Sequence, residues 1–176
     1  MELDAYQMWG GDVLEGFLLP WTGIGPLLAT IAIGILAVHV EGRSVIAIPI
    51  VFLCSMMVGA GISGCGIRFP YMHAMVALTV IVVGTALAVG RKYPVMATAI
   101  VLAAIGVVHG HADGLVIPLR SSPLVFLVGM LLGAGLLLAI GVWLGMWMEA
   151  HSTASRVFGV LVATGGTAIL IWAIAT

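Results

Sequence analysis

Charged side chains are scarce in this sequence. Only 7% of its 176 residues are Asp, Glu, Lys or Arg, whereas 62% are hydrophobic and the mean hydropathy is +1.27. A soluble domain usually carries about a quarter charged residues, so this chain lacks the polar surface that keeps a protein in water. The composition excludes a soluble globular protein and predicts an integral membrane protein in a lipid bilayer. The formal net charge of −1, without a basic patch, excludes a nucleic-acid partner.

Cysteine is also rare, and the amino terminus lacks the basic residues of a secretory signal. Cys54 and Cys65 are too few for a disulfide framework, and we expect both to be small buried residues. The first residues, MELDAYQMWGGDVLEG, are acidic, with no basic stretch ahead of the first apolar run. We therefore expect that run to remain in the mature protein.

Long apolar runs make up most of the chain. A bilayer core about 30 Å thick needs about 20 apolar residues per helix, and six runs meet or approach that length. The sequence predicts an all-α integral membrane protein, a compact bundle of six transmembrane helices. We expect one domain over residues 1–176, with residues 1–20 as an acidic amino-terminal segment before the first helix. The predicted helices are Trp21–Val40, Ser44–Ile62, Tyr71–Val89, Tyr93–His109, Pro123–Met148 and Ala154–Ala175.

Basic residues in the short connections indicate an orientation. Cytoplasmic loops of membrane proteins carry an excess of Lys and Arg. The first, third and fifth connections hold four such residues, and the second and fourth hold two. This distribution predicts that both termini lie outside the cell. The six residues are Arg43, Arg91, Lys92 and Arg156, against Arg68 and Arg120.

Glycine pairs spaced four residues apart occur in the fifth predicted helix. Gly129 with Gly133, and Gly141 with Gly145, form small-xxx-small patterns. Such patterns allow helices to approach closely in lipid. They predict tight helix packing inside the bundle, and the same surfaces are suited to a homo-oligomer or to other membrane subunits.

The stretch VVHGHADG, at the end of the fourth predicted helix, carries the most polar side chains in an apolar setting. If the helix continues, His109 and Asp113 share one face because they are four residues apart, and His111 points elsewhere. An imidazole with a carboxylate is half of a divalent-metal site, and it also suits proton handling. The alternative is a polar helix terminus in the headgroup layer. Gly110 and Gly114 allow a neighbouring helix to approach closely.

The sequence resembles the HupE/UreJ family, small membrane proteins linked to hydrogenase and urease and regarded as nickel permeases. VVHGHADG resembles the family pattern F-H-G-x-A-H-G-x-E, and residues from 16 to 38 resemble the start of its first helix, which carries H-P-x-x-G-x-D-H. In the first pattern Pro20 and Gly23 match, while Leu19 and Pro26 replace histidines and Gly25 replaces the aspartate. In the second pattern the matching residues are His109, Gly110, Ala112 and Gly114, and the replacements are Asp113 for a histidine, Val116 for the glutamate and Val108 for the phenylalanine.

The resemblance implies that most nitrogen and oxygen ligands of the family are missing, while the Pro and Gly residues that shape the backbone remain. Both motifs lie at the same membrane face if the predicted helices alternate in direction. They would then form one external site, with His109 and Asp113 as its ligands. His111 is a further candidate ligand, and Asp12 and Glu15 are carboxylates that would fold back to the site.

Three functions follow from these residues. The first is transport of nickel or another divalent metal ion, with the ion as substrate, across a bacterial or archaeal cytoplasmic membrane. The second is a non-transporting accessory or structural subunit of a larger membrane complex that keeps the family fold. The third is a haem protein using His109 as a ligand. An enzyme is not expected, because no nucleophile–base pair or phosphate loop is visible. His73, at the start of the third predicted helix, is expected to be a polar cap at the interface.

Overall fold

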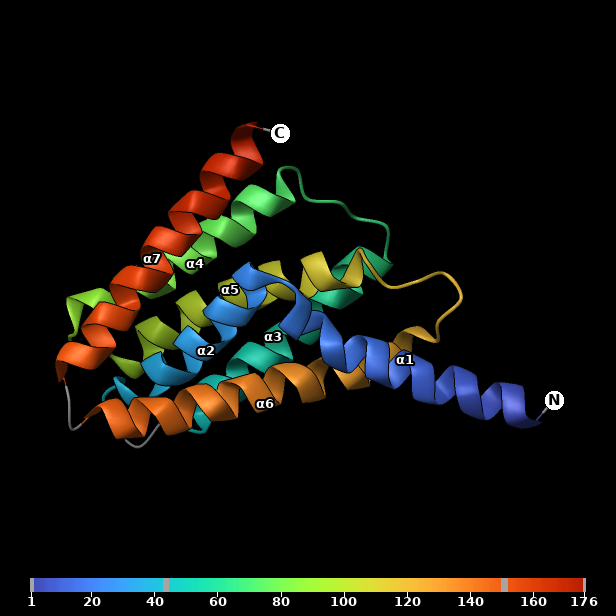
Figure 1. The fold of residues 1–176 in the computed structure, drawn as a ribbon, viewed down its shortest axis with the longest axis horizontal. Coiled ribbons are helices and arrows are strands. Elements are labelled where there is room, and N and C mark those ends of the chain that lie inside the picture. The colour runs from blue at the N-terminus through green and yellow to red at the C-terminus, as the bar shows by residue number, and fades with distance from the viewer. Residues whose placement is uncertain (1, 43–44, 150–151, 176) are drawn as a thin grey trace.

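The computed structural model describes residues 2–42, 45–149 and 152–175, and over these residues it is helical apart from turns and one isolated backbone bridge between Val40 and Tyr93 (Figure 1). The prediction of an all-α fold is confirmed. In chain order the helices are α1 (Glu2–Thr22), α2 (Ile24–Val38), α3 (Ala47–Gly64), α4 (Met72–Val89), α5 (Val95–Gly114), α6 (Pro123–Glu149) and α7 (Ser152–Ala175).

The first part of the chain differs from the sequence prediction. The predicted helix Trp21–Val40 corresponds to α2, but the residues expected to precede it form a helix of their own, α1, so the expectation that residues 1–20 lie before the first helix is wrong. The axes of α1 and α2 are bent by 82° at the break. Gly23 adopts an extended conformation there, with φ −98° and ψ 124°. Pro26 has no N–H for the carbonyl four residues earlier, so a continuous helix would lose a hydrogen bond at this point.

Five helices, α3 to α7, are each long and apolar enough to cross a membrane, and the bent pair of α1 and α2 makes a sixth span if counted as one. The fold is therefore that of an integral membrane protein. The connections 65–71 and 115–122 lie at the same end of the bundle as the amino terminus, and the connection 90–94 lies at the other end (Figure 1).

The helices pack mainly in pairs: α3 lies against α5, α4 lies against α7, and α6 runs along both α1 and α2. Glycine makes the contacts of α6 possible. A Cβ on Gly129 or Gly133 would overlap backbone carbonyls of α1, and a Cβ on Gly141 would overlap the Ile31 carbonyl of α2. Gly145 faces α2 in the same way, near Ile35. Both glycine pairs of α6 thus serve contacts within the chain.

The glycines of α5 form a second close contact, with α3. A Cβ on Gly110 would overlap the carbonyl oxygen of Met56, and one on Gly114 would overlap the hydroxyl of Ser63. Since this face of α5 is pressed against α3, the faces that carry His109 and Asp113 turn toward the other helices.

Large buried side chains from five helices fill the core. Fully buried examples are Ile33, Ile48, Phe52, Val80, Leu87, Leu102, Met130 and Leu138. The expectation that the cysteines are buried is wrong, because Cys54 and Cys65 are both exposed. Cys54 lies in α3, a helix suited to crossing the membrane, where an apolar outward face costs nothing because the surroundings are lipid.

Candidate functional site

A pocket of about 440 Å³ lies beside the break between α1 and α2. The break itself forms one wall, the start of α4 and the end of α5 form two more, and the last turns of α7 complete it. The lining residues are Leu19, Thr22, Gly23, Gly25, Pro26, Met72, His73, Val76, Ala112, Asp113, Leu115, Val116, Ile169 and Trp172.

Both sequence stretches that resemble the family motifs contribute to this one pocket. The first supplies Leu19 and Pro26, with the glycines between them, and the second supplies Ala112, Asp113 and Val116. The lining residues of the two stretches are more than eighty positions apart in the sequence. The bend at Gly23 and the packing of α2 against α4 bring the first stretch to the end of α5. Of the six positions at which the family patterns carry a histidine or an acidic residue, five line this pocket, and the sixth, His109, does not.

Among the described residues that line the pocket, Asp113 is the one that carries a carboxylate, and it is only 7% exposed. His73, from the first turn of α4, adds an exposed imidazole to the same lining. The Thr22 hydroxyl donates to the Leu19 carbonyl over 2.9 Å, so its proton is already used. The pocket offers one nearly buried oxygen ligand and one nitrogen ligand in a largely apolar wall.

His109 lies one helical turn deeper along α5 and is 2% exposed. Its Nε2 is 2.8 Å from the Oγ1 of Thr79 in α4. The Thr79 hydroxyl is also 2.6 Å from the carbonyl oxygen of Val76, a residue that lines the pocket. His109 is thus part of the contact between α4 and α5, directly behind the pocket wall.

His111 points away from this face, as the helical spacing predicts. The backbone N–H of Phe69 donates to its Nε2 over 3.3 Å, and the Phe69 ring stacks on the imidazole with centroids 4.2 Å apart. The fully buried Nδ1 has no hydrogen-bond partner among the described residues. His111 therefore holds the connection between α3 and α4 against the end of α5. In that connection Tyr71 adopts a left-handed conformation with φ 54°, an uncommon state for a residue with a side chain.

Asp12 and Glu15 lie at a different place. The backbone N–H of Ser122 donates to Oδ2 of Asp12 over 2.7 Å, and Arg120 pairs with Glu15 at 3.0 Å. Both carboxylates tie α1 to the segment before α6, and neither lines the pocket. Within the described residues no three His, Cys, Asp or Glu side chains are grouped so that they could hold a metal ion. A ligand role for these two carboxylates stays a prediction.

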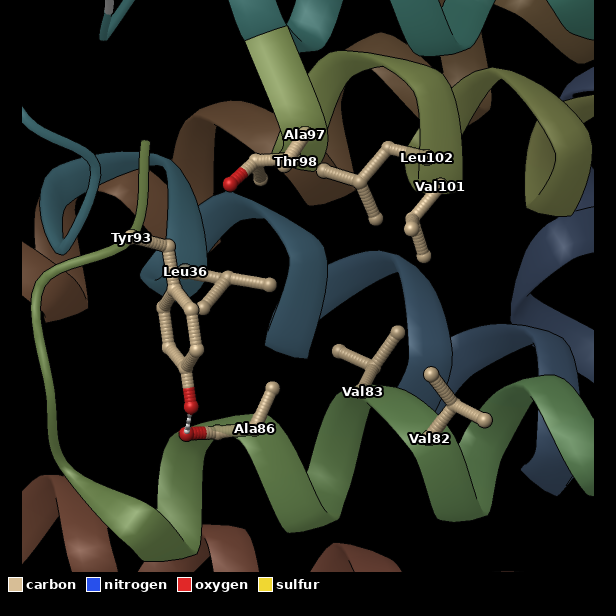
Figure 2. A pocket seen from close by; sticks show the side chains of 9 residues that line it. All are labelled: Leu36, Val82, Val83, Ala86, Tyr93, Ala97, Thr98, Val101 and Leu102. Carbon is tan, nitrogen blue, oxygen red and sulfur yellow. Dashed lines mark hydrogen bonds between the residues drawn. The ribbon is translucent and has the colours of Figure 1, made fainter. Parts of the chain in front are cut away.

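A second, smaller pocket of about 220 Å³ lies between α2, α4 and α5 toward the opposite end (Figure 2). The two polar side chains in its wall already donate hydrogen bonds to backbone carbonyls. The Tyr93 hydroxyl donates to the Ala86 carbonyl over 2.9 Å, and the Thr98 hydroxyl donates to the Pro94 carbonyl over 3.0 Å. Leu36, Val83 and other apolar side chains form the rest of the wall. This pocket offers no charged ligand for a cation. The free energy needed to remove water from the ion would far exceed the interaction energy that the apolar wall provides.

These features define a class of protein: a multi-pass helical membrane protein with a pocket at one end of its bundle and a nearly buried carboxylate in the wall of that pocket. The sequence model of the HupE/UreJ protein family matches residues 4–169. The chain is also 32% identical, over 161 residues, to Protein HupE of Rhizobium leguminosarum bv. viciae, an alignment that covers 90% of this chain and 84% of that one. The chain belongs to the HupE/UreJ family, whose members are membrane proteins of transporter type. No solved structure matches it.

Sequence reasoning missed three residues: one that lines the pocket and two that contact the buried histidines of α5. His73 was expected to be an interfacial cap, but it lines the pocket together with Asp113. Thr79 and Phe69, the partners of the two buried histidines, carry no motif and no telling spacing. They are identified only by the fold, in which α4 and the connection before it pack against α5.

Proposed function

We propose that the protein is a permease for a divalent metal ion, with nickel as the expected substrate, and that the ion enters through the pocket lined by Asp113. One observation carries the proposal: both motif-like stretches line the same pocket, and a nearly buried carboxylate stands in its wall. We further propose that the protein lies in a bacterial or archaeal cytoplasmic membrane with both termini outside.

Physical chemistry supports a cation as the ligand of this pocket. A carboxylate inside a membrane-spanning helix is expensive, and such residues commonly mark ion or proton pathways. Carboxylate oxygen and imidazole nitrogen, the groups of Asp113 and His73, are both ligands for first-row divalent metals. A small ligand set also suits transport, because an ion that passes through must be held weakly enough to leave.

Nickel accumulation in cells that express the protein tests the proposal. We expect uptake by Asp113→Asn, which keeps the side-chain shape but removes the charge, to fall to the level of cells without the protein. Glu41→Gln is the matched control, since it neutralises an exposed carboxylate that does not line the pocket and that lies at the opposite end of the bundle. Equal accumulation by the wild type and Asp113→Asn, at equal amounts of protein in the membrane, would contradict transport through this pocket.

A second candidate is the non-transporting subunit of a larger membrane complex. It is favoured by the sparse ligand set, because the described residues contain no group of three metal-binding side chains. The glycine pairs of α6 no longer support it, since they are used inside the chain. Extraction in mild detergent followed by native electrophoresis distinguishes the candidates. A subunit migrates with other proteins, whereas migration only as the chain itself or its oligomer argues against this role.

A further inference from the structure

The two buried histidines of α5 face different hydrogen-bonding partners. Nε2 of His109 contacts the Thr79 hydroxyl at 2.8 Å, and Nε2 of His111 accepts the backbone N–H of Phe69 at 3.3 Å. A neutral imidazole has one N–H donor and one nitrogen with a free lone pair. The partners therefore determine which nitrogen carries the proton in each ring.

The contacts of Thr79 determine the state of His109. The Thr79 hydroxyl has a single proton, and its oxygen also lies 2.6 Å from the Val76 carbonyl oxygen. Two oxygens this close repel each other unless a proton lies between them, and a carbonyl has none to give, so the hydroxyl donates its proton to Val76. The Thr79 oxygen must then accept a hydrogen bond from Nε2–H of His109. The lone pair of His109 consequently lies on Nδ1.

The Phe69 amide determines the opposite state for His111. A backbone N–H only donates, so Nε2 of His111 must hold the lone pair and Nδ1 must hold the proton. The stacked Phe69 ring, at 20° to the imidazole, keeps this geometry. The arrangement persists although the buried Nδ1 finds no acceptor among the described residues.

We infer that His109 and His111 are held in opposite neutral tautomers, and that Thr79 and Phe69 are the positioning residues that select them. An imidazole binds a metal through its lone pair, and the bond made by the other nitrogen decides which one is available. The nitrogen of His109 that this arrangement leaves free to bind a divalent cation is Nδ1. His111 is not a ligand while the Phe69 amide occupies its Nε2. This last step rests on the proposed transport function, whereas the tautomers do not.

Nitrogen-15 NMR of the full-length protein, labelled at the histidine rings and held in detergent, tests the tautomers directly. Under mildly alkaline conditions the rings are neutral, and protonated and unprotonated ring nitrogens give separate signals. Replacing each of the five histidines in turn assigns them. We expect Nε2–H for His109 and Nδ1–H for His111. The same tautomer in both rings, or Nδ1–H in His109, overturns the inference.

Two variants of Thr79 separate positioning from mere packing. Thr79→Val keeps the shape but removes the hydroxyl, so we expect His109 to populate both tautomers while His111 is unchanged. Thr79→Ser keeps the hydroxyl and should restore the wild-type pattern. An unchanged His109 in a folded Thr79→Val protein contradicts the role of Thr79. If that variant does not fold, the wild-type spectrum and Thr79→Ser still decide.

Titration with Zn²⁺, which is diamagnetic, tests the ligand atom. We expect Zn²⁺ to shift the Nδ1 signal of His109 and leave both nitrogens of His111 unshifted. We expect Thr79→Val to weaken Zn²⁺ binding by about tenfold, the usual effect of losing a residue that orients a ligand. Opposite tautomers without any Zn²⁺ shift overturn the ligand assignment and count against cation transport. A shift at His111 overturns the exclusion of that residue.

Discussion

Oδ2 of Asp12 accepts a hydrogen bond of 2.7 Å from the backbone N–H of Ser122, immediately before the first residue of α6. The contact joins two residues that are 110 positions apart in the sequence. A carboxylate at the beginning of a helix satisfies a free N–H and interacts favourably with the helix dipole. Asp12 therefore fixes α1 to the start of α6, and the residues expected to form a leading segment are part of the bundle.

Replacing Asp12 by Ala removes the acceptor at the start of α6. We expect the free energy of unfolding in detergent to fall by about 1–2 kcal/mol, the usual effect of losing a helix cap. Asp12→Asn keeps a side-chain oxygen in the same place and should lose clearly less. Thermal or denaturant unfolding followed by circular dichroism measures both. Equal losses in the two variants would show that charge, and not the hydrogen bond, is what matters.

Gly110 is a point of close contact between α5 and α3, since a Cβ would overlap the Met56 carbonyl oxygen. We expect Gly110→Ala to separate the helices and to lower the free energy of unfolding by about 1–3 kcal/mol, as overpacking usually does. Gly61→Ala, in α3, is the matched control because no atom lies within 4 Å of its added Cβ. Unfolding of both variants in the same detergent checks this. A similar loss for both would mean that the close contact is not the cause.

The sequence predicted the fold class and the six helices α2 to α7 from apolar length alone, because a membrane requires long helices whatever their packing. It failed at α1. The apolar-run criterion does not detect a helix whose residues include Asp12 and Glu15, and which is stabilised by packing against the glycines of α6. Helix spacing also separated His111 from His109 correctly, because that geometry is local.

The remaining features of the site depend on contacts between distant segments. His73 lines the same pocket as Asp113 only because α4 begins near the end of α5, and Thr79 contacts His109 only because α4 lies beside α5. No spacing within one segment encodes such contacts. The family resemblance indicated which two stretches matter, and the bend at Gly23 explains how they come to line one pocket.

His111→Phe tests the attachment of the connection between α3 and α4. The new ring can still stack on Phe69, but it offers no acceptor for the Phe69 amide. Leaving a partly buried N–H without a partner costs about 1–3 kcal/mol, so we expect faster hydrogen exchange at this amide. The Glu41 amide, bonded to the Tyr93 carbonyl over 2.9 Å at the opposite end, serves as the internal control. Unchanged exchange at Phe69 would show that another contact holds the connection.

Leu19→His tests whether the pocket can regain cation affinity. Leu19 lines the pocket with Asp113 and stands where the family pattern has a histidine. A new imidazole there adds a nitrogen ligand to an existing carboxylate. We expect the Ni²⁺ affinity of the purified protein to rise by about tenfold or more, at least the effect that a single supporting residue has in metal sites. Calorimetric titration in detergent measures it.

Leu18→His is the matched control for this gain, since Leu18 is 44% exposed and does not line the pocket. It adds the same imidazole one position away in the same helix, so non-specific binding to an added histidine would appear in both variants. A gain confined to Leu19→His locates the cation in the pocket. Combined with Asp113→Asn, the gain should largely disappear, because the remaining groups no longer include a carboxylate. An equal gain in Leu18→His, or one independent of Asp113, would remove the pocket as the place where the ion binds.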